Sequence, residues 1–183
     1  MVQHDVSKLE YASVVWNPSF KYLTESIEKV QRRFLKYLVF RIDGIYPIRN
    51  IPQKLLLSRF SILSLECRRI INLVMFLHSL VNNRLDAPSL LEQVCYWARP
   101  RSLRDKSIFY IKKSRTNILK FSPIYMMQMY FDKFNADVNI DIHVVSGQVL
   151  RKHLTNYFLN KNGIDIGSGV WSSSWDWDWF STG

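Results

Sequence analysis

The chain has 183 residues, of which 48% are hydrophobic, 14% aromatic and 22% charged, and its formal net charge is +10. This composition is that of a globular protein with a hydrophobic core, so wholly disordered, collagen-like and proline-rich proteins are excluded. Two cysteines cannot form a disulfide framework, and charged residues interrupt the N-terminus where an export signal needs an apolar run. We therefore expect an intracellular protein, nuclear or cytoplasmic, that is not secreted.

Helical periodicity dominates the first 60 residues. Apolar residues three and four apart predict a helix over residues 5–16, and Asn17-Pro18 is a start signal for the next helix. That helix, residues 20–38, has an apolar face made by Phe20, Leu23, Ile27, Val30, Phe34 and Leu38. Its other face is charged, with Glu25 spaced to pair with Lys29 and Glu28 with Arg32. We expect a loop over residues 42–50. A shorter helix should follow, beginning at Pro52 and ending near residues 61–64.

The remaining elements are set by caps and prolines. Ser64 can cap a helix that is apolar nearly all round and so should be central, until residues 86–89 break it. Residues 90–95 predict a short turn or helix, and 107–111 one short strand. Ser122-Pro123 starts another helix, and a last helix begins at Ser146. The predicted fold class is mainly α, an irregular bundle of about five to seven helices with at most a short strand pair.

Composition divides the chain into a helical region, residues 1–160, and a tail, residues 161–183. The tail is rich in Gly, Ser, Trp and Asp, with four of the six tryptophans and no basic residue after Lys161. It has no helical periodicity, so we expect a disordered tail, with an edge strand formed by the Trp/Asp alternation as the alternative.

Sites for metals and cofactors are not expected. Asp137, Asn139 and Asp141 have the opening spacing of a calcium loop, but Ile142 and Gln148 stand where the loop needs Gly and Glu. The four histidines have no zinc-ligand spacing, and the chain has neither a Gly-rich phosphate loop nor adjacent aspartates for two-metal phosphoryl transfer. A catalytic triad is recognised by geometry and not by order, so a small hydrolase stays open as a third interpretation.

The basic residues point to nucleic acid. They are densest in residues 99–120, where aromatic residues lie between them, and a second set lies on the 20–38 helix. Cations suit phosphates and flat rings suit bases, so both sets are candidates for contact with nucleic acid, with a solvated surface as the alternative. The candidate residues are Arg32, Arg33, Lys36, Arg99, Arg101, Arg104, Lys112, Lys113 and Arg115.

Four ordered segments go beyond composition. They are LEYASVVWNP (9–18) with IEKVQRRF (27–34), SLECRR (64–69) with the apolar run after it, Arg115-Thr116-Asn117, and Ser122-Pro123-Ile124-Tyr125. Together they resemble the region just downstream of the catalytic core in reverse transcriptases of non-LTR retrotransposons, the jockey-like elements especially. The resemblance covers residues 6–159, and the tail resembles nothing in that family.

The resemblance implies a truncated fragment of an RNA-directed DNA polymerase. The family's fingers and palm, whose paired aspartates bind magnesium, would precede Met1, so we expect no catalytic residue, no cofactor and no polymerase activity in this chain alone. The basic helical region would contact RNA or RNA–DNA duplex without sequence preference. Apolar surface around Tyr11, Trp16 and the 20–38 helix would pack on the missing palm and fingers. The alternative is a helical protein-interaction or scaffold remnant without nucleic-acid binding.

Overall fold

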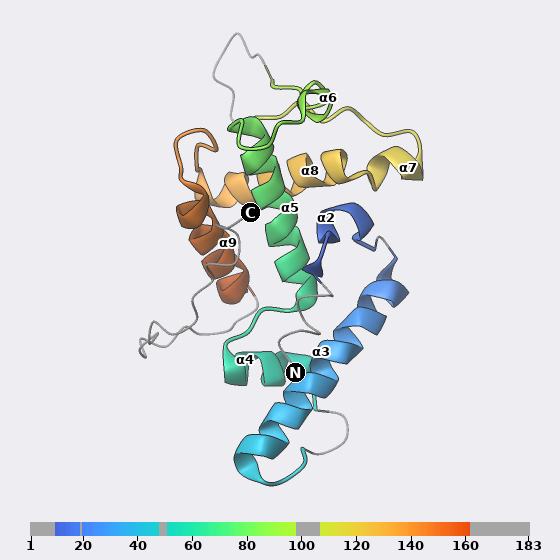
Figure 1. Cartoon of the computed structure of the whole chain (residues 1–183), viewed down its shortest axis with the longest axis vertical. Coiled ribbons are helices and arrows are strands. Elements are labelled where there is room, and N and C mark those ends of the chain that lie inside the picture. Colours follow the sequence, from blue (N-terminus) through green and yellow to red (C-terminus); the bar gives the residue numbers. More distant parts are fainter. Residues whose placement is uncertain (1–9, 19, 48–50, 98–106, 162–183) are drawn as a thin grey trace.

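The computed structural model describes residues 10–18, 20–47, 51–97 and 107–161 (Figure 1). Within these ranges the chain is mainly helical, and its only β-structure is a single bridge, which confirms the predicted fold class. The helices are α2 (Ser13–Trp16), α3 (Lys21–Asp43), α4 (Gln53–Phe60), α5 (Leu65–Val81), α6 (Pro88–Leu91), α7 (Asn117–Lys120), α8 (Pro123–Val138) and α9 (Gly147–Lys161). The predicted disordered tail, apart from Lys161, lies outside the described residues.

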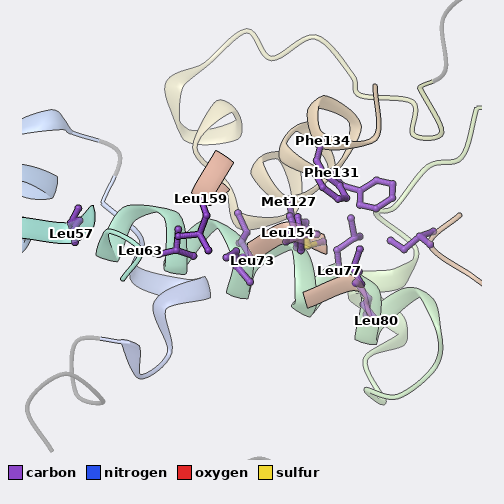
Figure 2. Packing of buried hydrophobic residues seen from close by; sticks show 14 of the residues in the cluster. Leu57, Leu63, Leu73, Leu77, Leu80, Met127, Phe131, Phe134, Leu154 and Leu159 are labelled. Atoms are coloured by element: carbon purple, nitrogen blue, oxygen red, sulfur yellow. The ribbon is translucent and has the colours of Figure 1, made fainter. Parts of the chain in front are cut away.

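Helix α5 is the centre of the fold, as its apolar sequence predicted. Ser64 caps it by accepting a hydrogen bond from the backbone N–H of Cys67 at 3.3 Å. Helices α8 and α9 pack against α5, with α8 running across it, and α2 and α3 also contact α5 (Figure 1). Figure 2 shows the core that results, in which Leu73 and Leu77 of α5 gather with Phe131 of α8 and Leu154 of α9.

Helices α8 and α9 begin where their caps predicted. Ser122 accepts a hydrogen bond from the Tyr125 N–H at 3.4 Å, with Pro123 at the first helical position. Asn139 ends α8 in the left-handed conformation, with φ of 56°. Ser146 accepts from the Val149 N–H at 3.5 Å and so begins α9. These two helices therefore follow from local signals in the sequence.

The continuous helix predicted over residues 5–16 is wrong in its described part. Ala12 has a left-handed φ of 49°, and α2 starts only after it. In a regular helix the Tyr11 carbonyl would accept from the Val15 N–H, but here it accepts from the indole N–H of Trp16. Glu10 is meanwhile held by Arg68 of α5, with Nε and Oε1 2.6 Å apart. A tertiary ion pair and a side-chain hydrogen bond thus replace the helical pattern.

Helix α3 is longer than predicted, and it ends at Asp43. Gly44 follows in the left-handed conformation, with φ of 72°, and its N–H bonds to the Phe40 carbonyl at 2.9 Å. Glycine adopts this conformation without the steric cost that a Cβ would add. Arg59 of α4 then donates to both carboxylate oxygens of Asp43 at 2.7 Å, which fixes α4 against the end of α3.

The short strand predicted over 107–111 is a single antiparallel bridge between Tyr96 and Phe109. Two backbone hydrogen bonds flank it, from the Trp97 N–H to the Ile108 carbonyl at 2.9 Å and from the Tyr110 N–H to the Cys95 carbonyl at 2.8 Å.

Pro88 begins α6 slightly before the predicted turn, and α7 was not predicted. In the part of the chain that is described, no helix is long and apolar enough to span a bilayer.

Candidate functional site

The basic residues of α3 lie outside its buried side. Arg32 and Arg33 are exposed and Lys36 is half-buried. Because the helix rises about 1.5 Å per residue, these three positions span about 6 Å along its axis, close enough to meet neighbouring phosphates. Arg32 is also tied to α4, since its Nη2 donates to Oε1 of Gln53 at 3.1 Å.

The predicted ion pair between Glu28 and Arg32 is wrong, because the side-chain amide of Gln53 stands between them. Gln53 accepts from Arg32 through Oε1 and donates to the Glu28 carboxylate through Nε2. The other Glu28 oxygen accepts from the Glu66 N–H at 2.8 Å, in the first turn of α5. Glu28 is only 9% exposed, and the free N–H groups of a helix start favour a negative charge there.

Helix α3 leaves much of its predicted apolar face exposed. Its buried residues are Glu28, Gln31, Leu35 and Val39, which lie to one side of that face. Leu23, Val30 and Tyr37 are 39%, 47% and 46% exposed, and Ile27 and Phe34 beside them are half-buried. These five residues share one side of the helix and are called the α3 stripe below.

The second group of candidate residues is described only in part. Lys112, Lys113 and Arg115 are exposed and precede α7, whereas Arg99, Arg101 and Arg104 lie outside the described residues. Beside the bridge, the rings of Trp97 and Tyr110 are 5.0 Å apart and about half exposed. Arg32, Arg33 and Lys36 lie on α3, whereas Lys112, Lys113 and Arg115 lie between the bridge and α7. The described candidate cations therefore come from two separate segments of the chain.

A cavity of about 680 Å³ lies between α2, α3, α5 and the start of α8. Its wall is apolar along Ile70 and Leu73 of α5 and Met126 and Tyr130 of α8. Its charged residues come mainly from α3 and from the first turns of α5. The sequence did not predict this cavity, because its lining comes from segments that are far apart in the chain.

Arg69 lines the cavity and is 1% exposed. Its Nε donates to Oδ1 of Asn17 at 3.1 Å, and neither Nη1 nor Nη2 has a hydrogen-bond partner among the described residues. Burial lowers the pKa of this guanidinium, while the carboxylates of Glu28 and Glu66 act in the opposite direction. One signal in the sequence could have identified the site, namely that Arg69 lies on a helix that is apolar nearly all round.

The residues of the calcium-like spacing have structural partners. Asp137 accepts from the Tyr157 hydroxyl at 2.7 Å, Asn139 ends α8, and Asp141 accepts from the His143 N–H at 2.9 Å. The described residues contain no group of three or more His, Cys, Asp or Glu side chains that could hold a metal ion.

Comparison of the chain with family models, with curated proteins and with solved structures gave no match.

Proposed function

We propose that this chain contacts the sugar–phosphate backbone of RNA or an RNA–DNA duplex, as a fragment resembling the post-catalytic region of a non-LTR retrotransposon reverse transcriptase. The observation that supports this function is the grouping of Arg32, Arg33 and Lys36 on α3, with both arginines exposed. A polymerase holds a duplex whose sequence changes at every step, so its helices need phosphate-directed cations and not base-specific contacts. In this proposal the chain supplies no catalysis, and magnesium belongs to the palm of the parent enzyme.

Charge reversal tests this function. We expect R32E/R33E/K36E to abolish most binding to a labelled RNA duplex and to an RNA–DNA duplex, measured by fluorescence anisotropy between 50 and 200 mM salt. Each lost phosphate contact lowers the magnitude of the slope of log affinity against log salt by about one. The triple variant should therefore show a slope smaller by about two or three.

A matched control separates position from net charge. K133E/K152E/K161E changes the charge by the same amount, at exposed lysines on α8 and α9. We expect this control to bind nearly as tightly as the wild type. Equal losses in the two variants would mean that only the overall charge matters, and unchanged binding of the α3 variant would remove this helix from the contact.

The second candidate function is protein interaction, and the exposed α3 stripe favours it. A partner that covers Leu23, Val30 and Tyr37 would bind mainly through apolar contact. Such association changes little with salt, whereas phosphate contact weakens steeply. Salt dependence therefore distinguishes the two functions in one experiment.

A further inference from the structure

Two aromatic rings lie on the outer face of the bridge between Tyr96 and Phe109. Successive side chains of an extended segment point to opposite sides. Phe109 points inward, where it is 1% exposed and its ring meets that of Phe131 on α8 at 5.7 Å. Trp97 and Tyr110 therefore point outward, and they are 44% and 48% exposed, with their rings 5.0 Å apart. The bridge thus holds two neighbouring rings at the surface.

The segment that carries Tyr110 is held from two directions. The hydrogen bonds of the bridge fix it to residues 95–97. From α8, the Asp132 carboxylate accepts from the Ser107 hydroxyl at 2.6 Å and from the Ile108 N–H at 3.3 Å. A surface whose groups are already in place loses less conformational entropy when it binds a ligand. The rings are therefore positioned for contact in advance.

Cations follow the rings directly along the chain. Residues 107–120 contain four Lys or Arg residues and no acidic residue. Ile111 packs against the core, while Tyr110 before it and Lys112 and Lys113 after it are exposed. The alternation over the first three of these residues places Tyr110 and Lys112 on the same side of the segment. Rings on which bases stack, beside cations that meet phosphates, are the combination that single-stranded nucleic acid requires.

The tilt of the rings favours a single strand over a duplex. In a duplex the bases are paired and stacked on each other, so their faces are covered except at the ends. The ring planes of Trp97 and Tyr110 are inclined to each other by 46°. Bases stacked on both rings would be inclined in the same way, which an unpaired strand allows and a regular helical stack does not.

We propose that Trp97 and Tyr110 stack the unpaired bases of a single-stranded RNA segment, while Lys112 and Lys113 contact its phosphates. This binding mode rests on the proposed function, because the chain must contact RNA for the rings to take part. It adds a second kind of contact to that function. The cations of α3 hold the backbone of a duplex, whereas the rings hold bases that have no pairing partner.

Three labelled probes test the site in the full chain. They are a single-stranded uridine dodecamer, a strand of the same length built from abasic sugars, and the RNA duplex of the charge-reversal experiment. We expect the wild type to bind the dodecamer at least about tenfold more tightly than the abasic strand, which keeps the phosphates but has nothing to stack. Equal affinity for the two strands in fluorescence anisotropy would overturn the proposal, and this comparison needs no variant.

Substitution of the rings locates the stacking. W97L/Y110L keeps apolar side chains without rings, and it should bind the dodecamer about tenfold more weakly while binding of the duplex is unchanged. Its salt dependence should equal that of the wild type, because no phosphate contact is lost. W97F/Y110F keeps the rings and should retain most of the affinity. The matched control Y22L/Y46L removes two other exposed rings, 64% and 61% exposed, and should bind as the wild type does.

Substitution of the lysines tests the phosphate contact. Each phosphate contact with a single strand contributes about 0.7 to the slope of log affinity against log salt, so K112Q/K113Q should lower its magnitude for the dodecamer by about 1.4. K133Q/K152Q removes the same charge at exposed positions of α8 and α9 and should leave the slope unchanged. Equal slopes in K112Q/K113Q and the wild type would overturn the role of the two lysines.

Failure of this site and failure of the proposed function give different results. Wild-type affinity of W97L/Y110L for the dodecamer, together with loss of duplex binding in R32E/R33E/K36E, would overturn the stacking site alone. A wild type that binds neither the dodecamer nor the duplex would overturn both. Loss of self-association in W97L/Y110L with RNA binding unchanged would overturn the stacking site in favour of a contact between proteins.

Discussion

One carboxylate, that of Glu28, joins three helices. It is on α3, it accepts the side-chain amide of Gln53 on α4, and it accepts the Glu66 N–H in the first turn of α5. Its negative charge lies where the helix dipole of α5 is positive. Burial of the residue, at 9% exposure, makes each of these interactions stronger than it would be at the surface.

Substitution of Glu28 by Gln should destabilise the fold. The shape of the side chain is kept, but the charge-assisted bond to the start of α5 is lost, and we expect the free energy of unfolding in urea to fall by about 1–2 kcal/mol. E25Q is the matched control on the same helix, since Glu25 is exposed and its ion pair is with Lys21, at 3.9 Å. A similar decrease in the free energy of unfolding in E28Q and E25Q would show that the buried contact of Glu28 stabilises the fold no more than an exposed ion pair does.

Asp43 gives the fold a dependence on acid pH. Its bonds to Arg59 lower the pKa of the carboxyl below the ordinary value of 3.8. Because the pKa is lower in the folded state, the Asp43–Arg59 ion pair stabilises the fold fully above about pH 3.8. This stabilisation is lost as the pH falls through the folded-state pKa.

The pKa of Asp43 can be followed directly through its carboxyl ¹³C shift. We expect R59Q to move the midpoint of this titration upward, toward 3.8, because the bidentate partner is gone. R41Q removes another arginine near the end of α3 and should leave the midpoint unchanged. A midpoint that is the same in the wild type and in R59Q would contradict the geometry of this pair.

At the scale of the elements, α9 has one face buried in the core and another exposed, and the two faces should contribute differently to stability. Leu154 is fully buried in the core with α5, while Val149 on the same helix is 46% exposed. We expect L154A to lower the free energy of unfolding by about 2–5 kcal/mol and V149A to change it little. Urea denaturation of both variants measures this, and comparable effects would mean that α9 is not packed as described.

The existence of most helices could be predicted because their signals are local. Ser64, Ser122-Pro123 and Ser146 each begin a helix, and these caps act through residues three positions away. The rotation of α3 could not be predicted, since it depends on groups distant in the chain. Gln31 points inward because its amide donates to the Leu63 carbonyl at 2.9 Å. Glu28 points inward because its carboxylate accepts a hydrogen bond from the Glu66 N–H of α5.

The candidate site also has features that the sequence could predict and features that it could not. The exposure of Arg33 followed from the charged face of its helix, which periodicity alone defines. The cavity at Arg69 did not, because Asn17 and the α8 wall meet it only in three dimensions. Whether the basic residues bind nucleic acid stays a prediction.

For the molecule as a whole, the α3 stripe opposes the effect of a net charge of +10. Charge of this size keeps small proteins apart, but a contiguous apolar surface favours association. We expect the wild type to self-associate in sedimentation velocity, and L23Q/V30T/Y37Q to be monomeric at the same concentration without a change in charge.

The control for this experiment removes apolar side chains elsewhere. Leu55, Ile118 and Val144 are 60%, 87% and 80% exposed and do not belong to the stripe. L55Q/I118T/V144T should therefore associate as the wild type does. A wild-type protein that stays monomeric and ignores a dye for exposed apolar surface would contradict the prediction.

The bridge between Tyr96 and Phe109 also bears on how this protein could change over evolutionary time. Its flanking hydrogen bonds hold Trp97 against Ile108, so the two ends of the intervening segment are kept side by side. Once two positions of a chain are held together, doubling the number of residues between them costs only about 0.6 kcal/mol of closure entropy. Added residues between Trp97 and Ile108 should therefore destabilise the helical core only slightly.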